Sequence, residues 1–160
     1  MDEDFSIIPI TESEYNEWIV TSNNNYILEM IRGGKAKEEA EKNAYDDFHK
    51  LLPNGLQTEH HFIYSIRVSD KLVGTLWFGI KGPESNRKAY IYDIIIDEDQ
   101  RGKGYGKKTL KFLEEEAKKL GLHHIGLHVF GHNKIARELY EKLGYEAKSL
   151  WLEKNLNENN

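Results

Sequence analysis

The most informative stretch of this sequence for the fold is a glycine-rich turn, Arg101-Gly102-Lys103-Gly104-Tyr105-Gly106. It follows the apolar run Ile94-Ile95-Ile96 and precedes residues 107–120, whose apolar side chains recur at helical spacing. The pattern predicts a strand, a glycine turn and a helix N-terminus. Glycines let backbone approach a bound group closely, and a helix N-terminus flanked by basic side chains attracts anions. The first hypothesis is a site for a diphosphate-bearing ligand.

Two widespread phosphate motifs fit this turn poorly. A Walker loop requires Gly-Lys followed directly by Ser or Thr, whereas Lys108 separates Lys107 from Thr109. A dinucleotide-binding fold places its glycines after the first strand, and these glycines lie about two-thirds of the way along the chain. A glycine-rich turn with a solvated basic face is the structural alternative.

The composition indicates one globular domain. The chain has 160 residues, of which 39% are hydrophobic, so we expect a single domain over residues 1–154 and a disordered tail over residues 155–160. The net charge of -5 disfavours binding to nucleic acid, which requires a dominant positive field. The basic residues of the glycine turn are a local feature that suits a small polyanion.

The sequence lacks cysteine, a secretory signal and a long apolar run, and these absences narrow the possible classes of protein and of site. It contains no cysteine, which excludes disulfides, thiolate metal sites and a cysteine nucleophile. Its acidic N-terminus does not resemble a secretory signal, and it has no apolar run of eighteen residues. We therefore expect a cytoplasmic protein that does not bind membranes.

Periodicity and turn residues predict an α/β order of elements. The expected strands are residues 5–10, 61–68, 72–80, 89–96, 125–130 and a last strand or hairpin at 145–152. The expected helices begin at the capping-box pattern of Thr11 and Glu14, near residue 36, at the glycine turn and near Asn133. Such an order predicts a mixed sheet covered on both faces, with ligands at the carboxyl ends of its strands.

Further motifs at fixed spacing make a resemblance specific. After the glycine turn come a helix, a strand ending Leu127-His128-Val129, and then Asn133, Ala136, Leu139-Tyr140 and Gly144-Tyr145. Over about residues 60–154 this arrangement resembles the GNAT acetyltransferase superfamily. Residues 51–61, with Pro53, Gly55 and His60-His61, also resemble one uncharacterised bacterial subfamily of these enzymes.

The resemblance implies a fold and a cosubstrate. The GNAT fold has a mixed central sheet of about six to seven strands, helices on both faces, and a splay between two central parallel strands. The diphosphate of acetyl-CoA then lies on the glycine turn, formed by Arg101, Gly102, Lys103, Gly104, Tyr105 and Gly106. The pantetheine arm pairs like an extra strand with the main chain of Ile94, Ile95 and Ile96. Asn133 matches a cofactor-contacting position, and it also suits a plain helix N-cap.

The resemblance also implies catalytic roles. Tyr140 matches the general acid, and a phenol of pKa about 10 can protonate a leaving thiolate within hydrogen-bond reach. The alternative for Tyr140 is a core aromatic beside Leu139. An amine acceptor is mostly protonated at neutral pH, so a group or a water must also accept its proton.

Four residues compete for the role of base. His128 is the first candidate, because an imidazole accepts protons near neutral pH, although related ribosomal-protein alanine acetyltransferases carry a glutamate there. A half-buried structural histidine is the alternative at this position. Asp93, Glu59 and His60 are the other candidates, and together with Tyr92 they are expected to bind the acceptor. The histidine spacings match no metal site, so we expect no metal.

The sequence thus predicts an N-acetyltransferase that moves acetyl from acetyl-CoA directly to a primary amine of a small molecule or peptide. The negative overall charge favours a cationic acceptor. The alternatives are a protein N-terminal or lysine acetyltransferase, a non-catalytic acyl-CoA-binding sensor, and a nucleotide-binding module. A homodimer formed through sheet edges is compatible with the sequence.

Overall fold

The computed structural model describes residues 4–157, which form two compact units that divide in sequence between Phe130 and Gly131. Each unit is described by itself. The expected single domain over residues 1–154 stays a prediction. Of the tail expected to be disordered, residues 158–160 lie outside the described residues.

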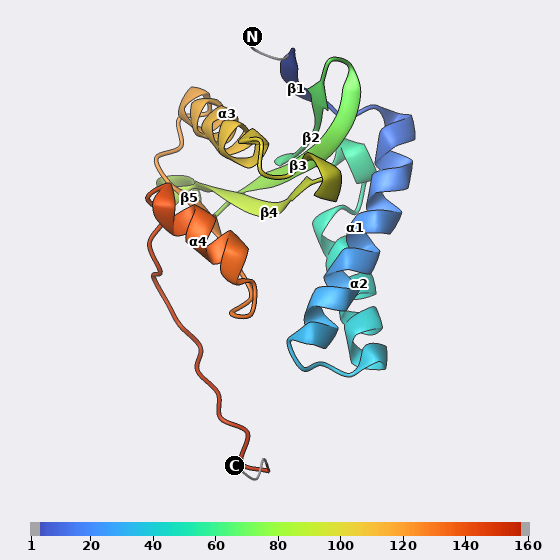
Figure 1. Ribbon diagram of the computed structural model, residues 1–160, viewed down its shortest axis with the longest axis vertical. Helices are drawn as coiled ribbons and strands as arrows, with labels where there is room; N and C mark the ends of the chain where they lie inside the picture. The colour runs from blue at the N-terminus through green and yellow to red at the C-terminus, as the bar shows by residue number, and fades with distance from the viewer. Residues whose placement is uncertain (1–3, 158–160) are drawn as a thin grey trace. The chain divides into compact units, whose positions relative to one another are not determined.

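The first unit is built on a sheet of five strands in the order β1-β2-β3-β4-β5 (Figure 1). The strands are β1 (Phe5–Pro9), β2 (His61–Val68), β3 (Lys71–Lys81), β4 (Lys88–Ile96) and β5 (Ile125–Leu127). The first four pair antiparallel, and β4 and β5 pair parallel. The expected mixed sheet is therefore confirmed, and β1 forms one of its edges.

Helices cover both faces of this sheet. The helices α1 (Glu12–Arg32) and α2 (Lys37–Leu51) lie on one face, where Trp18 and Phe48 contact Trp77 of β3. The helix α3 (Tyr105–Lys119) lies on the other face, as Figure 1 shows, and its Phe112 packs against Tyr64 of β2. The second unit contains α4 (Lys134–Lys142).

The helix α1 begins where the sequence predicts. Thr11 accepts a hydrogen bond from the Glu14 backbone, and the Glu14 carboxylate accepts one from the Thr11 backbone, which completes the capping box. The helix then runs unbroken through Asn23, Asn24 and Asn25, although asparagine is a poor helix former. Buried Trp18, Ser22 and Met30 lie on one stripe of the helix, so tertiary packing outweighs the local preference.

The predicted number of strands is wrong. Instead of six to seven, the residues that the structure describes form five, and residues 145–152 form no strand. Leu150, Trp151 and Leu152 are exposed there, and these residues have no ladder partner in the described part of the chain. An isolated apolar segment without a neighbouring strand does not gain the hydrogen bonds that stabilise a sheet. As a result β5, which is only three residues long, is the second edge of the sheet.

The two parallel strands part early, which confirms the expected splay. The ladder of β5 joins only Ala89, Tyr90 and Ile91 of β4, whereas β4 continues to Ile96. A β-bulge lies at the point of parting, because the β3 register passes from Ile91 to Asp93 and leaves Tyr92 as the extra residue. The outer edge of β4 beyond Ile91 is therefore open to a further extended chain.

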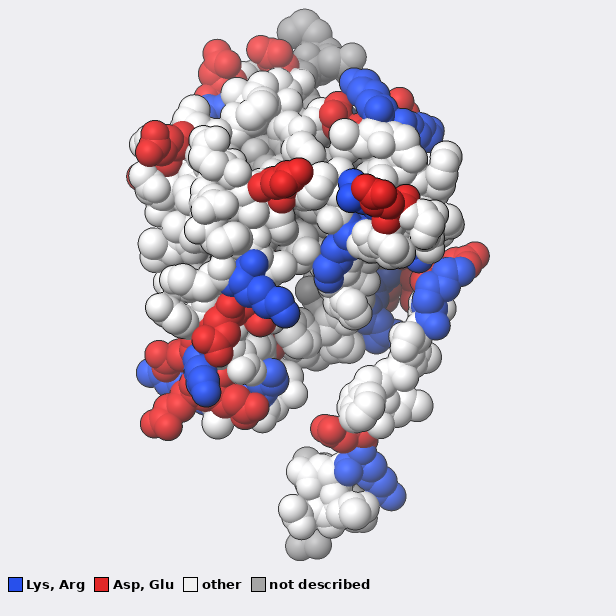
Figure 2. All heavy atoms as spheres, turned by 180° about the vertical axis from the view of Figure 1, so that it is seen from behind, with Lys and Arg blue, Asp and Glu red and all other residues white. Residues whose placement is uncertain are grey.

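Surface charge in the first unit is mixed in sign. Figure 2 shows Lys and Arg side chains interspersed with Asp and Glu side chains where α1 turns into α2. The sequence there supplies Arg32, Lys35, Lys37, Glu38, Glu39 and Glu41. Because the two signs alternate, this surface presents no strong field of one sign. In residues 4–157 no helix combines the length and the apolar character that a membrane span requires.

Candidate active site

The glycine turn forms an open N-terminus for α3. Gly104 is the N-cap residue, with φ of 84°, a left-handed conformation that side chains rarely adopt, and Gly102 is also left-handed, with φ of 81°. No side chain caps the helix. A helix cannot satisfy the N–H groups of its own first turn, so these donors face outward as they do in anion sites. A Cβ added at Gly102 or Gly104 would meet no atom within 4 Å, so the backbone of the turn is accessible.

The Arg101 side chain links this turn to the end of β4 through a hydrogen bond. Its Nε donates to the carbonyl oxygen of Ile96 at 3.0 Å, while Lys103 donates to Gln100 at 3.2 Å. Both basic side chains are exposed, and so they also raise the local positive potential. The Tyr105 ring is buried and stacks on Phe5 at 5.6 Å between centroids. Tyr105 can therefore contribute to the turn only through its backbone.

The last three residues of β4 lead into this turn. Ile94, Ile95 and Ile96 pair with β3 on one side and have no strand on the other side within the described residues. The backbone N–H of Ile94 donates to the carboxylate of Asp93. These residues thus bring an open strand edge and an open helix N-terminus to the same corner of the sheet.

A cluster of four rings lies on the sheet face that carries α1 and α2. We call His61, Trp77, Tyr90 and Tyr92 the aromatic cluster. Tyr92 stacks on Trp77 at 4.6 Å between centroids, Tyr90 meets Tyr92 edge-on at 4.7 Å, and the Trp77 Nε1 donates to the His61 Nδ1 at 3.0 Å. Burial, followed by the nearby His60 and Lys81, lowers the pKa of His61. His61 is therefore a neutral acceptor in this cluster at neutral pH.

The ring of Tyr92 lies directly over Gly79 of β3. A Cβ at Gly79 would come within 2.8 Å of the Tyr92 ring, 3.1 Å of the His60 carbonyl oxygen and 3.3 Å of the His61 ring. Any larger residue would displace the Tyr92 ring or the start of β2. The bare backbone at this position thus determines where the aromatic cluster lies.

His128 lies one residue beyond β5, at the point where β5 leaves β4. Its Nδ1 lies 2.5 Å from the Tyr90 hydroxyl oxygen, which is hydrogen-bond distance. Burial raises the pKa of Tyr90, and the opposing effect of a hydrogen bond from the His128 backbone is smaller, so Tyr90 stays a neutral phenol. His128 itself is exposed, which leaves its Nε2 available to a ligand.

Asp93 is held between the sheet and α1. The Ser22 hydroxyl donates to its Oδ2 at 3.0 Å, and Ser22 itself is buried. Burial raises the pKa of Asp93 from 3.8 to about 6, even though its bonds to Ser22 and Ile94 act in the opposite direction. A carboxyl group of this kind changes its charge close to neutral pH.

Glu59 and His60 lie immediately before β2. They face each other with 3.4 Å between the Glu59 Oε1 and the His60 Nε2, and Glu59 is exposed. His60 has a left-handed backbone with φ of 65°, which is rare outside glycine. Its neighbour His61 belongs to the aromatic cluster, so this loop borders the same sheet face.

The remaining predicted site residues belong to the second unit. Tyr140 lies on α4, is buried, and meets Tyr145 edge-on at 5.4 Å between ring centroids. Asn133 is the N-cap of α4, and its side chain accepts a hydrogen bond from the Ala136 backbone at 3.4 Å. The capping role expected of Asn133 is therefore present.

Tyr92, Asp93 and His128 are brought to one region of the first unit, and sequence reasoning missed several of their partners. Tyr90, which contacts His128, and Ser22, which contacts Asp93, were not predicted as site residues, and neither was Lys81. His61 was noted only for the resemblance of residues 51–61 to a subfamily. Alternation along β4 was the available signal, since Tyr90 and Tyr92 are two residues apart. In residues 4–157 no three His, Asp or Glu side chains are grouped as metal ligands would be.

Comparison with known proteins agrees with this geometry. The family model described as "Acetyltransferase (GNAT) family" matches residues 15–145. The uncharacterised N-acetyltransferase YycN of Bacillus subtilis is 34% identical over 152 residues, which cover 94% of this chain and 97% of YycN. A crystal structure of YycN superposes with a TM-score of 0.89 at 33% identity, covering 96% of this chain and 99% of that one. The uncharacterised N-acetyltransferase YdgE of the same organism is 30% identical and covers 95% of this chain and 98% of YdgE.

The open corner at the end of β4 and the parting of two parallel strands define an acyl-CoA-dependent acyltransferase fold. The chain belongs to the GNAT family of N-acetyltransferases. A protein from Clostridium acetobutylicum described as a predicted acetyltransferase, whose structure holds acetyl-CoA, has the same fold, with a TM-score of 0.64 at 21% identity over 95% of this chain and 96% of that one.

The raised pKa of Asp93 predicts a specific pH dependence of stability. The carboxyl ionises near pH 3.8 in the unfolded chain and near pH 6 in the fold, so between these values the folded state binds more protons. The free energy of unfolding then falls as the pH rises through this range. Replacing Asp93 with Asn removes the ionisation and keeps an acceptor for Ser22. We expect the stability of Asp93→Asn relative to the wild type to rise by on the order of 1–3 kcal/mol between pH 4 and pH 7.

Urea unfolding of both proteins at several pH values measures this difference. A difference that stays constant from pH 4 to pH 7 would contradict the buried, proton-binding state of Asp93.

Proposed function

We propose that this protein transfers acetyl from acetyl-CoA to a primary amine of a small molecule or peptide by direct attack, without an acetyl-enzyme intermediate. The observation that carries the proposal is the uncapped α3 N-terminus at Gly104, placed where β4 has parted from β5. The chain has no cysteine, which agrees with direct transfer. The family match supports the reaction class.

The glycine turn fits the diphosphate of acetyl-CoA. Left-handed Gly102 and Gly104 keep side chains away from the first-turn N–H groups of α3, and Arg101 and Lys103 add positive charge. The open edge of Ile94, Ile95 and Ile96 fits the amide groups of the pantetheine arm, which can form ladder-like bonds with it. Acetyl-CoA supplies the activated acetyl group, and these main-chain groups hold and orient it.

His128 is proposed to accept the proton of the acceptor amine. We assign the proton of the His128–Tyr90 contact to Nδ1, because in that tautomer the Nε2 of the imidazole carries the lone pair. The exposed Nε2 can then take a proton from an incoming ammonium group, which frees the amine for attack. Asp93 is the second candidate, because its raised pKa also suits proton transfer near neutral pH.

Tyr140 is proposed to protonate the leaving thiolate. This role rests on the match between residues 133–145 and the family motif, together with the chemistry of a phenol, which can donate a proton to a thiolate. We propose that the two substrates also contact four further residues: Asn133, Glu59, His60 and Tyr92.

Gly104→Glu tests the diphosphate site. A glutamate there carries negative charge into the turn and strains a left-handed position, so we expect binding of acetyl-CoA to fall at least 100-fold. Gly121→Glu is the matched control, since Gly121 is also left-handed, with φ of 76°, and open to solvent at the other end of α3. Calorimetric titration with acetyl-CoA measures both. Equal affinities of Gly104→Glu and Gly121→Glu would remove the site from the glycine turn.

Tyr140→Phe tests the general acid. The variant keeps the ring and loses only the hydroxyl, so we expect kcat to fall by about 10- to 1,000-fold while the affinity for acetyl-CoA changes little. Steady-state assays that detect released thiol, combined with calorimetric titration, separate the two effects. Full turnover by Tyr140→Phe would show that another group or a water protonates the thiolate.

His128→Ala tests the base. Loss of the imidazole should displace the limb of the pH–rate profile along which the rate rises with pH, with a fall in kcat/KM of about 100-fold at neutral pH. His123→Ala removes an exposed histidine just before β5 and serves as the control. Profiles of the two variants are compared with that of the wild type. If His128→Ala keeps the wild-type profile, the role passes to Asp93, Glu59, His60 or water.

A further inference from the structure

Lys81 holds an unusual position beside the aromatic cluster. It ends β3 opposite Lys88 of β4, and its Nζ lies 4.1 Å from the centre of the Tyr90 ring and 5.5 Å from that of Tyr92. Among the residues that the structure describes, no carboxylate forms an ion pair with Lys81 or Lys88. The Lys81 ammonium is thus held on aromatic faces, which attract a cation but leave its N–H donors available to a ligand.

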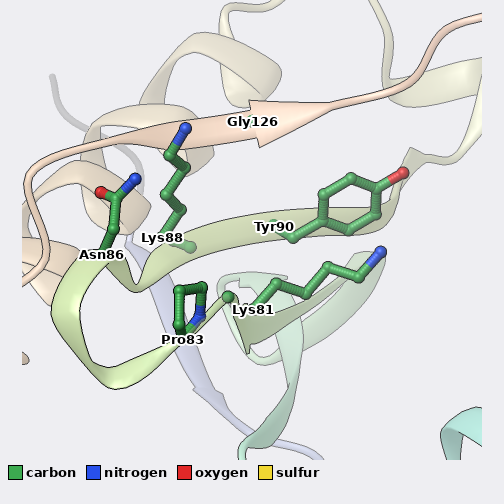
Figure 3. A pocket seen from close by; sticks show the side chains of 8 residues that line it. Lys81, Pro83, Asn86, Lys88, Tyr90 and Gly126 are labelled. Carbon is green, nitrogen blue, oxygen red and sulfur yellow. The ribbon is translucent and has the colours of Figure 1, made fainter.

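Lys81 and Tyr90 also line a pocket of about 290 Å³. Figure 3 shows Lys81 and Lys88 at its wall with Pro83, Asn86, Tyr90 and Gly126. Two of its lining residues are cationic and none is acidic, in contrast to the net charge of -5 of the whole chain. The potential inside this pocket therefore favours a negatively charged group.

The pocket adjoins the proposed base through Tyr90. One side of this residue faces the Lys81 ammonium, and its hydroxyl contacts His128. The His128 and Tyr90 ring centroids are 5.7 Å apart. A single small molecule can therefore reach both the ammonium and the imidazole.

We propose that the acceptor is an amine that also carries a carboxylate or phosphate group. Lys81, assisted by Lys88, binds this acidic group while the amine faces His128. This inference rests on the proposed acetyl transfer. The proposal replaces the expectation of a cationic acceptor, which was based on net charge. Overall charge describes the long-range field, whereas recognition depends on the groups within a few ångströms.

Matched amine pairs that differ only in the acidic group test the proposal. The pairs are O-phosphoethanolamine and ethanolamine, glucosamine 6-phosphate and glucosamine, and lysine and 1,5-diaminopentane. The first two pairs examine phosphate and the third examines carboxylate. Calorimetric titration at constant ionic strength gives Kd for each compound with the wild type and with Lys81→Met, Lys81→Arg and the surface control Lys111→Met.

We expect at least one acidic compound to bind the wild type about 10- to 100-fold more tightly than its partner, as a charge-assisted hydrogen bond implies. Lys81→Met should abolish this preference, Lys81→Arg should restore most of it, and Lys111→Met should leave it intact. Equal binding of the members of every pair to the wild type would overturn the proposal. So would a preference that survives in Lys81→Met.

The same compounds are then assayed for acetylation. Because the binding comparison does not depend on turnover, failure of acetyl transfer with every compound would count against the proposed reaction alone. A wild type that acetylates the acidic members with a lower KM than their partners, and loses this advantage in Lys81→Met, supports both proposals.

Discussion

The main-chain polar groups along the outer edge of β4 are the constraint on which this molecule depends. Beyond Ile91 the neighbouring strand has left, and within the described residues no strand pairs with the edge that ends at Ile96, where the Arg101 side chain bonds to the last carbonyl oxygen. Unpaired backbone donors and acceptors are costly when they lose water, so such an edge invites another extended chain. The adjacent N-terminus of α3 is unsatisfied for the same reason. One corner of the sheet thus offers hydrogen bonds and positive potential to a single elongated anion.

The two faces of the sheet in the first unit differ in the side chains that they carry. The face under α3 is packed with buried apolar side chains, such as Ile66, Val73 and the ring of Tyr105, which fix the glycine turn against the sheet. On the face under α1 and α2, polar groups lie among the rings: Asp93 contacts Ser22 of α1, and Tyr90 contacts His128. Burial there raises the pKa of Asp93 and Tyr90 and lowers that of His61, so these groups differ from their counterparts in water.

Much of this architecture was predictable from sequence. The capping box at Thr11, the hairpin of β2 and β3, and the helix that follows the glycine turn carry strong local signals, and each formed within one or two residues of its expected bounds. The strand expected at residues 145–152 did not form in the described structure, because an alternating apolar pattern cannot supply its own ladder partner. The contact of Tyr90 with His128 was equally hidden, since it joins residues 38 positions apart in the chain. The contact of Lys81 with Tyr90 depends on the register of β3 against β4, which the sequence alone does not give.

The proposed acetyl-CoA site at the end of β4 consists mainly of peptide groups, whereas the region around Gly79 consists mainly of side chains. Peptide groups are present whatever the residue, so the proposed binding of acetyl-CoA tolerates substitutions outside the glycines. Tyr92 lies over the backbone of Gly79. Substitutions of Tyr92 or of its neighbours would therefore leave the proposed binding of acetyl-CoA unchanged. Under the proposed function, substitutions around Gly79 would therefore change which amine is accepted while the binding of acetyl-CoA stays the same.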